Sequence, residues 1–480
     1  MTDIRYVCVS DMHLGEEDSL LTNLKPASTD TDPTEPSPVL RQLAECLRYL
    51  ISKNKSKRKP TLILNGDILE LALTTTNEAA MVFERFVELV LPARGRLFDE
   101  IIYVPGNHDH HLWEGCRETQ YVDYIATLEP GKPLPIPWHA TNMFARDDAP
   151  RVHAYFLSRL VRRYEHLGEK DFEISVAYPN LGLLGDDGRK CVVFHHGHFI
   201  ESLYRLMSTL KTLVFPDRAV PRHVWDLQAE NFAWIDFFWS SMGRSGQAGR
   251  DMELVYEKMQ DPEQLKKLLA TLATSLAERY DLPGWGDRME ASLLRGLFNT
   301  IVDRFARSER ALTDRVLSKD AENGLWAYMK GPLRNQLDLE LKGNMPADVT
   351  FVFGHTHKPF QEDMNFRGYP KWVNVYNTGG WVVESVDPVP RHGAAVVLID
   401  EKLDVTSLRL YNEAEDPTLY SVGVEEATHT GEEASPFHRR IVDLIDPSAE
   451  PWQTFSTLVA RAVRVRAQNL RARINERDTS

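Results

Sequence analysis

Most of the histidines in this sequence gather in four short polar stretches, each at the end of an apolar run. The nine are His13; His108, His110 and His111; His195, His196 and His198; and His355 and His357. Asp11, Asn107 and Asp109 stand in the same stretches, and Asp67 stands in a fifth stretch, "NGDILE", at the end of another apolar run. Buried carboxylates and imidazoles that face one another need opposite charge or a metal ion to offset their lost hydration. The pattern therefore predicts a metal centre.

The number and type of these donors indicate which metals would bind. Mixed nitrogen and oxygen donors suit Mn, Fe, Zn, Co or Ni better than an all-oxygen Mg or Ca cage. Two ions about 3.5–4 Å apart would need roughly this many ligands, one of them a bridging carboxylate. We therefore expect two divalent metal ions, with Mn as the first choice.

The elements that must position these side chains can be read from the apolar runs. Each run has about the length of a buried strand: "RYVCVSDMHLG", "PTLILNGDILE", "EIIYVPGNHDHH", "CVVFHHGH" and "VTFVFGHTHKP". Helix-like stretches at 39–56 and 77–98 separate the first three runs. This β-α-β-α-β order favours parallel strands, with ligands bound beyond their carboxyl ends, where the polar stretches lie.

The remainder of the chain divides into further segments. Residues 201–344 are expected to be a helical insertion, because apolar residues recur at helical spacing, for instance from Leu265 to Leu276 and from Leu294 to Phe305. The runs at 371–385, 393–400 and 404–411 resemble a second, more antiparallel sheet. Residues 413–480 begin as an acidic loop and end in an Arg-rich helix.

Composition and charge narrow the class of protein. The 480 residues are 42% hydrophobic and 26% charged, as in a folded protein. A formal net charge of −14 argues against nonspecific binding to nucleic acid. The four cysteines form no CxxC pair, and neither a leader peptide nor an apolar stretch of about 18 residues is evident. We expect a cytoplasmic protein with a small-molecule substrate.

The motifs "SDMHLG", "NGDILE", "PGNHD", "HHG" and "GHTH" resemble, in order, those of the calcineurin-like metallophosphoesterases. The resemblance covers residues 1–200 and 345–412, which we expect to form one discontinuous catalytic domain. It implies an α/β fold, a four-layer α-β-β-α sandwich, here with the large helical insertion at 201–344 and a separate C-terminal segment at 413–480.

The resemblance also implies which residues hold the metals. Asp11, His13 and His357 would bind the first ion, and Asp67 would bridge to the second. The remaining ligands of the second ion would be Asn107, His196 and His355. His196 is chosen because the family's ligand stands directly before the glycine. His195 would then point to the other side of its strand, and His198 could contact substrate or support the ligands.

The same resemblance implies a mechanism. A metal-bridging hydroxide would attack the phosphorus of a phosphomonoester or phosphodiester in line. His108 would act as general acid or stabilise the phosphoryl oxygens, and Asp109 would orient its imidazole. Glu70 could support Asp67 or cap the following helix, and His110 and His111 could support the catalytic loop or lie at the surface.

Other functions stay open at this point. "GDILE", "HHGH", "GHTHKP" and "VNVYNTGGW" look most like the family branch that contains UDP-2,3-diacylglucosamine pyrophosphohydrolase, a nucleotide-lipid pyrophosphate hydrolase. That enzyme carries Arg where this chain has His108, and its helical insertion is shorter. A nuclease is a further alternative, and so is a non-catalytic scaffold stabilised by metal.

Two segments have a structural and a functional interpretation. The aromatic stretch from Trp225 to Gly246 is expected to be a helix packed within the insertion; the alternative is an apolar wall for an acyl chain or nucleobase. The arginines from Arg461 to Arg473 are expected to pair with the protein's own carboxylates; the alternative is a patch for nucleic acid or for peripheral contact with anionic lipid.

Overall fold

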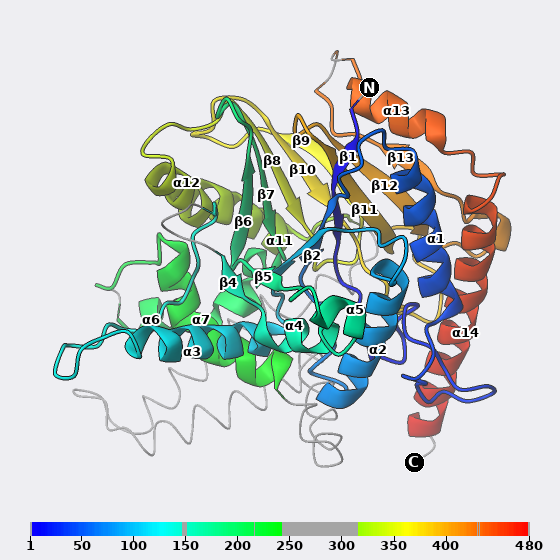
Figure 1. Cartoon of the computed structure of the whole chain (residues 1–480), viewed down its shortest axis with the longest axis horizontal. Helices are drawn as coiled ribbons and strands as arrows, with labels where there is room; N and C mark the ends of the chain where they lie inside the picture. Colours follow the sequence, from blue (N-terminus) through cyan, green and yellow to red (C-terminus); the bar gives the residue numbers. More distant parts are fainter. Residues whose placement is uncertain are drawn as a thin grey trace.

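Two β-sheets lie face to face at the centre of the molecule, and helices cover their outer faces (Figure 1). The computed structural model describes residues 2–145, 151–215, 217–241, 315–429, 431 and 433–478. The predicted helical leucine patterns at 265–276 and 294–305 lie outside the described residues.

The first sheet has eight strands in the order β13-β12-β11-β1-β2-β3-β5-β4. They are β1 (Ile4–Val9), β2 (Thr61–Asn65), β3 (Glu100–Val104), β4 (Val152–His153), β5 (Ile174–Val176), β11 (Gly393–Asp400), β12 (Val405–Asn412) and β13 (Gly423–Glu425). β1, β2, β3 and β5 are parallel. The expected β-α-β-α-β start of the chain is confirmed.

The two helices of this unit are shorter than predicted. They are α1 (Pro38–Ser52) and α2 (Thr76–Val90). The expected second helix ran on to residue 98, but Pro92 has no amide hydrogen to donate and disfavours helical geometry in the residue before it. At the N-terminus of α1, Ser37 caps the helix: its side chain accepts a hydrogen bond from the amide of Leu40.

The second sheet has five strands in the order β6-β7-β8-β10-β9. They are β6 (Asn180–Leu184), β7 (Lys190–His195), β8 (Asp348–Phe353), β9 (Phe360–Met364) and β10 (Val373–Asn377). Only the first of the three runs expected to form this sheet belongs to it. The other two, β11 and β12, extend the first sheet, where β11 pairs antiparallel with β1. Apolar alternation marks a strand but does not tell which sheet the strand joins.

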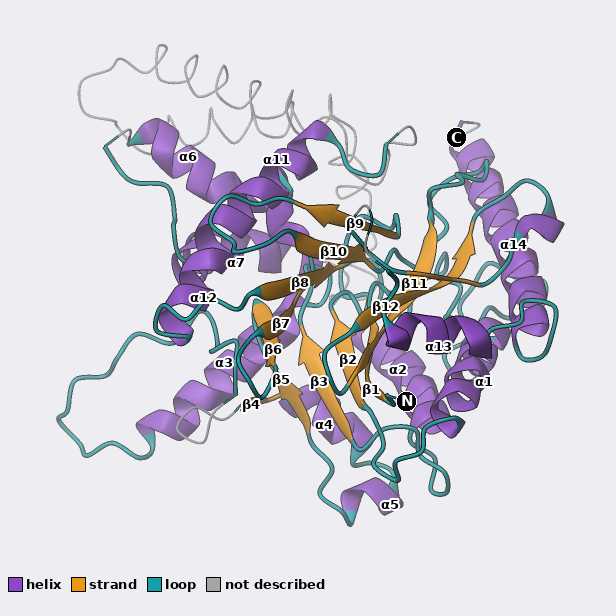
Figure 2. Cartoon of the chain, turned by 90° about the horizontal axis from the view of Figure 1, so that it is seen from above, coloured by secondary structure: helices purple, strands orange, loops and turns teal. Residues whose placement is uncertain are grey.

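Three hydrophobic clusters separate four layers (Figure 2). Successive residues of β2 divide between two of them: Leu62 and Leu64 face the outer helices, whereas Ile63 faces the second sheet. The first cluster includes Leu47 of α1 and Phe83 of α2. The α-β-β-α sandwich is thereby confirmed.

The first sheet's outer layer also contains α3 (His110–Ile125), α4 (Tyr155–Val161), α5 (Glu165–Gly168), α13 (Pro436–Leu444) and α14 (Trp452–Asp478). The Arg-rich α14 packs on α1 through Trp452, and two of its arginines, Arg471 and Arg473, pair as expected with the protein's own carboxylates, whereas Arg466 donates to backbone carbonyls. Arg473 contacts Glu17 and Asp18, and Arg471 contacts Asp387. The C-terminal segment is therefore built into the first sheet's side of the sandwich.

The described ends of the insertion form the outer layer of the second sheet. The short 3-10 helix η1 (His198–Ile200) leads into them, and they comprise the 3-10 helix η2 (Ser202–Arg205), then α6 (Leu206–Val214), α7 (Val224–Ser240), α11 (Lys319–Tyr328), the π-helix η5 (Met329–Leu333) and α12 (Arg334–Glu340). Trp234, Ile235 and Trp239 of α7 are buried in this layer, which agrees with a packed helix. The boundaries expected for the insertion stay a prediction. Among the described residues, no helix combines the length and apolar character needed to cross a bilayer.

Candidate metal centre

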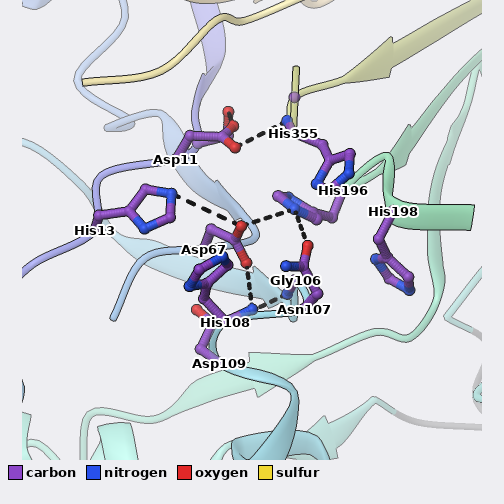
Figure 3. A network of polar contacts seen from close by, with 12 residues as sticks. Asp11, His13, Asp67, Gly106, Asn107, His108, Asp109, His196, His198 and His355 are labelled. Carbon is purple, nitrogen blue, oxygen red and sulfur yellow. Dashed lines mark hydrogen bonds and ion pairs between the residues drawn. The ribbon is translucent and has the colours of Figure 1, made fainter. Parts of the chain in front are cut away.

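The polar stretches meet at the carboxyl ends of five strands, between the two sheets (Figure 3). Asp11 follows β1, Asp67 follows β2, Asn107 follows β3, His196 follows β7 and His355 follows β8. Every one of the seven predicted ligands is at most 1% exposed; the other two are His13 and His357. Parallel strands end at the same edge of a sheet, so residues distant in sequence converge there.

Donor atoms form two groups that could each hold a cation. The first comprises Asp11, His13 and His357, and the second comprises Asp67, His196 and His355. A third group, His13, Glu70 and His108, shares a histidine with the first. The motifs implied the same grouping, and the division of these residues between two ions stays a prediction.

Asp67 stands between the two groups. Its Oδ2 lies 3.8 Å from Nε2 of His13 and 3.1 Å from Nε2 of His196. Its Oδ1 accepts a hydrogen bond from the amide of His108 at 2.8 Å. One oxygen thus fixes the carboxylate while the other faces both groups, which is the arrangement a bridging ligand needs.

The backbone at these ligands is strained. Five of the seven have a positive φ, between 44° and 71°. They are Asp11, His13, Asp67, His355 and His357. A residue with a side chain pays about 1–3 kcal/mol for such a conformation, and such strain concentrates at functional sites. Gly66, directly before Asp67, also has a positive φ, +86°. A Cβ on this residue would lie 2.4 Å from Nδ1 of His196.

Three glutamates hold the outer nitrogens of three predicted ligands. Nδ1 of His13 lies 2.7 Å from Glu70, Nδ1 of His357 lies 2.8 Å from Glu384, and Nε2 of His355 lies 2.7 Å from Glu201. Nε2 of His13 lies 3.8 Å from Asp67 and Nε2 of His357 lies 3.5 Å from Asp11, so these ring nitrogens face the centre. Metal-binding histidines usually have such a partner, which fixes the ring and raises its basicity.

Glu201 and Glu384 were not identified from the sequence. They follow no motif spacing, and their partners stand far away in the chain. Glu70 was identified, but its contacts differ from both interpretations offered for it. It binds histidine rings rather than Asp67, and its second oxygen accepts from the amides of Ala72 and Leu73 within the following loop, not from a helix.

Burial and neighbouring charges shift the pKa values of the side chains in the centre. Burial lowers the pKa of His13 to about 4, despite the opposing effect of the hydrogen bond that its ring donates to Glu70. Burial would also lower the pKa of His196, but the carboxylates of Asp67 and Asp11 outweigh it and raise that pKa to about 9. Burial would raise the pKa of Asp67, yet the surrounding histidines hold it well below its usual value. Such a cluster binds positive charge, and metal ions would take the place of its protons.

Asn107 has the orientation of a ligand. Its Oδ1 lies 3.0 Å from Nε2 of His196, and its Nδ2 donates to the hydroxyl of Tyr204 at 3.2 Å. The amide oxygen therefore faces the second group of donors. Together with the histidine rings, this donor set fits a pair of transition-metal ions.

Glu70 takes the role that was expected of Asp109. Nδ1 of His108 lies 2.8 Å from Oε2 of Glu70. Both oxygens of Asp109 instead accept backbone amides, that of Gly106 at 2.7 Å and that of Ile68 at 2.8 Å. Because Asp109 stands just before α3, its side chain turns back to the loops after β2 and β3. It stabilises the loops rather than the imidazole.

His195 and His198 take different places. His195 points away from the centre, as strand alternation implies, and its ring lies 4.6 Å from that of Tyr328. Burial holds its pKa well below the usual value. His198 lies beside the centre, with its ring 5.7 Å from that of His196 and its Nε2 3.3 Å from the hydroxyl of Tyr178 (Figure 3).

His110 and His111 connect α3 to the insertion. Nε2 of His110 lies 2.7 Å from the side-chain nitrogen of Gln228, and Nδ1 of His111 lies 3.1 Å from Asp236. Both partners belong to α7. The two histidines thus link the loop that carries His108 to the helical layer.

A family model for calcineurin-like phosphoesterases matches residues 4–214. The match includes the motifs from Asp11 to His196, while His355 and His357 lie beyond it and reach the centre through the fold. No curated protein matches the chain significantly. The family match and the buried donor groups agree on a metal-dependent phosphoesterase.

Proposed function

We propose that this chain, a member of the calcineurin-like phosphoesterases, hydrolyses a small phosphomonoester or phosphodiester at a centre of two metal ions. The observation that carries the proposal is the position of Asp67 Oδ2 between Nε2 of His13 and Nε2 of His196. A single carboxylate oxygen that faces two sets of donors suits a shared ligand better than an isolated ion.

The residues that would hold the ions follow from the two donor groups. Asp11, His13 and His357 would hold the first, Asn107, His196 and His355 the second, and Asp67 would bridge them. Bound ions would lower the pKa of a coordinated water for in-line attack on phosphorus and offset the charge on the phosphoryl oxygens. Mn is the proposed metal because the donors are mixed, with Fe, Zn, Co and Ni as alternatives.

His108 is the proposed catalytic histidine. Glu70 binds its Nδ1, so the ring is held with Nε2 turned the other way. From there His108 would donate a proton to the leaving oxygen or a hydrogen bond to the phosphoryl group. A scaffold without activity has less reason to hold this histidine so firmly.

A substrate panel tests the proposal. Purified protein with added Mn would be assayed on p-nitrophenyl phosphate, its bis-ester, cyclic nucleotides, nucleotide-lipid pyrophosphates and single-stranded DNA. We expect hydrolysis of at least one simple ester and its loss in His108→Ala. Protein that retains no transition metal and cleaves neither p-nitrophenyl ester would overturn the proposal.

The same panel decides between substrates. Preference for the nucleotide-lipid pyrophosphate would place the chain beside the branch that its motifs resemble, and salt-sensitive cleavage of DNA would indicate a nuclease. The net charge of −14 favours a small-molecule substrate over nucleic acid. A cytoplasmic location is also proposed, since Cys8, Cys46, Cys116 and Cys191 are all free and buried.

A further inference from the structure

We propose that the turns that lead into the helical insertion, residues 198–205, position the ligands of the second metal ion and leave those of the first untouched. The two residues that do so are Glu201 and Tyr204. This inference rests on the proposed two-metal function. It makes the insertion part of the metal centre and assigns it control over one ion of the pair.

Glu201 acts on His355. Its Oε1 lies 2.7 Å from Nε2 of His355, whose ring belongs to the second donor group. A carboxylate on the outer nitrogen fixes the rotation of the ring and directs Nδ1 to the centre. Glu201 stands directly between η1 and η2, so its position depends on the path of these turns.

Tyr204 acts on Asn107. An amide can turn either its oxygen or its nitrogen toward a cation, and only the oxygen can bind one. The hydroxyl of Tyr204 accepts from Nδ2 of Asn107 at 3.2 Å, which keeps Oδ1 on the side of His196. The Tyr204 ring is 5% exposed and lies 5.0 Å from the ring of His355. It therefore contacts two predicted ligands of the same ion.

The returning end of the insertion holds this segment in place. Asp320, at the start of α11, accepts hydrogen bonds from the amide of Ser202 at 3.0 Å and from its hydroxyl at 2.6 Å. Gly324 of the same helix lies against the carbonyl of Ile200, where a Cβ would come within 1.6 Å of the oxygen. The two ends of the insertion thus close on each other beside the second donor group.

The first donor group is supported from elsewhere. Glu70, which binds His13, follows β2, and Glu384, which binds His357, follows β10. Neither glutamate belongs to the insertion. The two halves of the centre therefore have separate supports, and a change in residues 198–205 should reach only one of them.

Metal binding measured site by site tests this separation. Mn²⁺ affinity and stoichiometry would be determined by equilibrium dialysis, with electron paramagnetic resonance to detect the exchange-coupled pair. We expect two ions in the wild type. Tyr204→Phe and Glu201→Gln should each weaken one ion by about 10–100-fold, leave the other unchanged and reduce the coupled signal. In protein that already carries Asn107→Ala, Tyr204→Phe should reduce the affinity little further, because both residues act on the same ion.

Two variants serve as matched controls. Tyr369→Phe removes another tyrosine hydroxyl, that of a partly buried residue packed against the same hydrophobic cluster, which donates to the carbonyl of Met329 at 2.9 Å, and it should leave both affinities unchanged. Glu384→Gln should weaken the other ion, the one that retains its affinity in Glu201→Gln. These two results together would separate a positioning role from a general loss of packing.

Two results would overturn the inference. One is that Tyr204→Phe and Glu201→Gln both bind the two ions with the affinity of the wild type. The other is an equal loss of both ions in the two variants together with a lower melting temperature of the metal-free protein, which would indicate a purely structural role. Failure of the proposed function differs from either, because the wild type itself would then bind no metal pair or hydrolyse no ester.

Discussion

Oε2 of Glu70 lies 2.8 Å from Nδ1 of His108, the proposed catalytic histidine. The same oxygen lies 2.7 Å from Nδ1 of His13, a predicted ligand of the first ion. The two rings stand edge to face, with their centroids 4.8 Å apart. One buried carboxylate therefore orients both a metal ligand and the group expected to meet the substrate.

Glu70→Gln should reduce both activity and metal binding. The amide lacks the negative charge and offers only one acceptor oxygen for the two rings. We expect kcat and the affinity for the first ion to fall by about 10–100-fold, measured by steady-state kinetics and equilibrium dialysis. Glu45→Gln, on the exposed face of α1, should leave both unchanged. An unaltered kcat in Glu70→Gln would contradict this role.

His108→Asn should retain both metals and lose turnover. A general acid contributes about 10²–10⁴-fold, and most where the leaving group is a poor one. The loss should therefore be greater for phenyl phosphate than for p-nitrophenyl phosphate. Steady-state kinetics on the two esters checks this. Equal losses on both would instead assign His108 to stabilisation of the phosphoryl oxygens.

Asp67→Asn should lose both ions together with activity. Its Oδ2 faces both donor groups, and an amide cannot replace an anionic bridge between two cations. Metal content by elemental analysis after gel filtration checks the prediction. Asp226→Asn, exposed on α7, is the control. A variant at Asp67 that keeps a full metal pair would rule out the bridging role.

Arg466→Ala should destabilise the fold, whereas Arg471→Ala should not. The Arg466 guanidinium is buried and donates to the carbonyls of Ser19 at 3.1 Å and Thr22 at 2.6 Å, in the loop after His13. Removing it takes the Arg466 donor from the buried carbonyl of Thr22, while the Ser19 carbonyl keeps a hydrogen bond from the amide of Thr22 at 3.3 Å, at a cost of about 1–3 kcal/mol. The side chain of Arg471 is 60% exposed, and its loss should stay within about 0.5 kcal/mol. Urea denaturation of both variants measures the difference.

Glu413→Gln should flatten the pH dependence of stability. Burial, reinforced by the charge of Glu384, raises the pKa of Glu413 from 4.5 to about 7. The folded state therefore binds a proton that the unfolded state releases, so the contribution of this carboxyl to stability is greatest below pH 4.5 and is lost as the pH rises through about 7. The amide carries no charge and can still accept from the amide of Val389.

Melting temperatures between pH 5 and 8 check this prediction. The wild type should lose more stability over this range than Glu413→Gln does. Parallel curves for the two proteins would show that Glu413 titrates normally in the folded state.

The amino-acid sequence alone determined the start of the first sheet and the seven candidate ligands. Each candidate ligand stands just after an apolar run of strand length, so its place at a sheet edge is a local property, whereas the choice of these seven came from the resemblance to calcineurin-like metallophosphoesterases. The preference for a metal centre follows from the same local chemistry, because acids and imidazoles at one buried edge need a cation.

Only the tertiary structure decided what surrounds those ligands. β11 and β10 are both apolar runs of strand length, yet β11 joins the other sheet, since pairing partners are chosen by packing across the whole sandwich. Glu201 and Glu384 meet their histidines through contacts that no spacing encodes. Glu70 rather than Asp109 reached His108 because a loop conformation, not adjacency in the chain, directs a side chain. Local sequence thus set the chemistry of the ligands, and long-range packing set the groups that orient them.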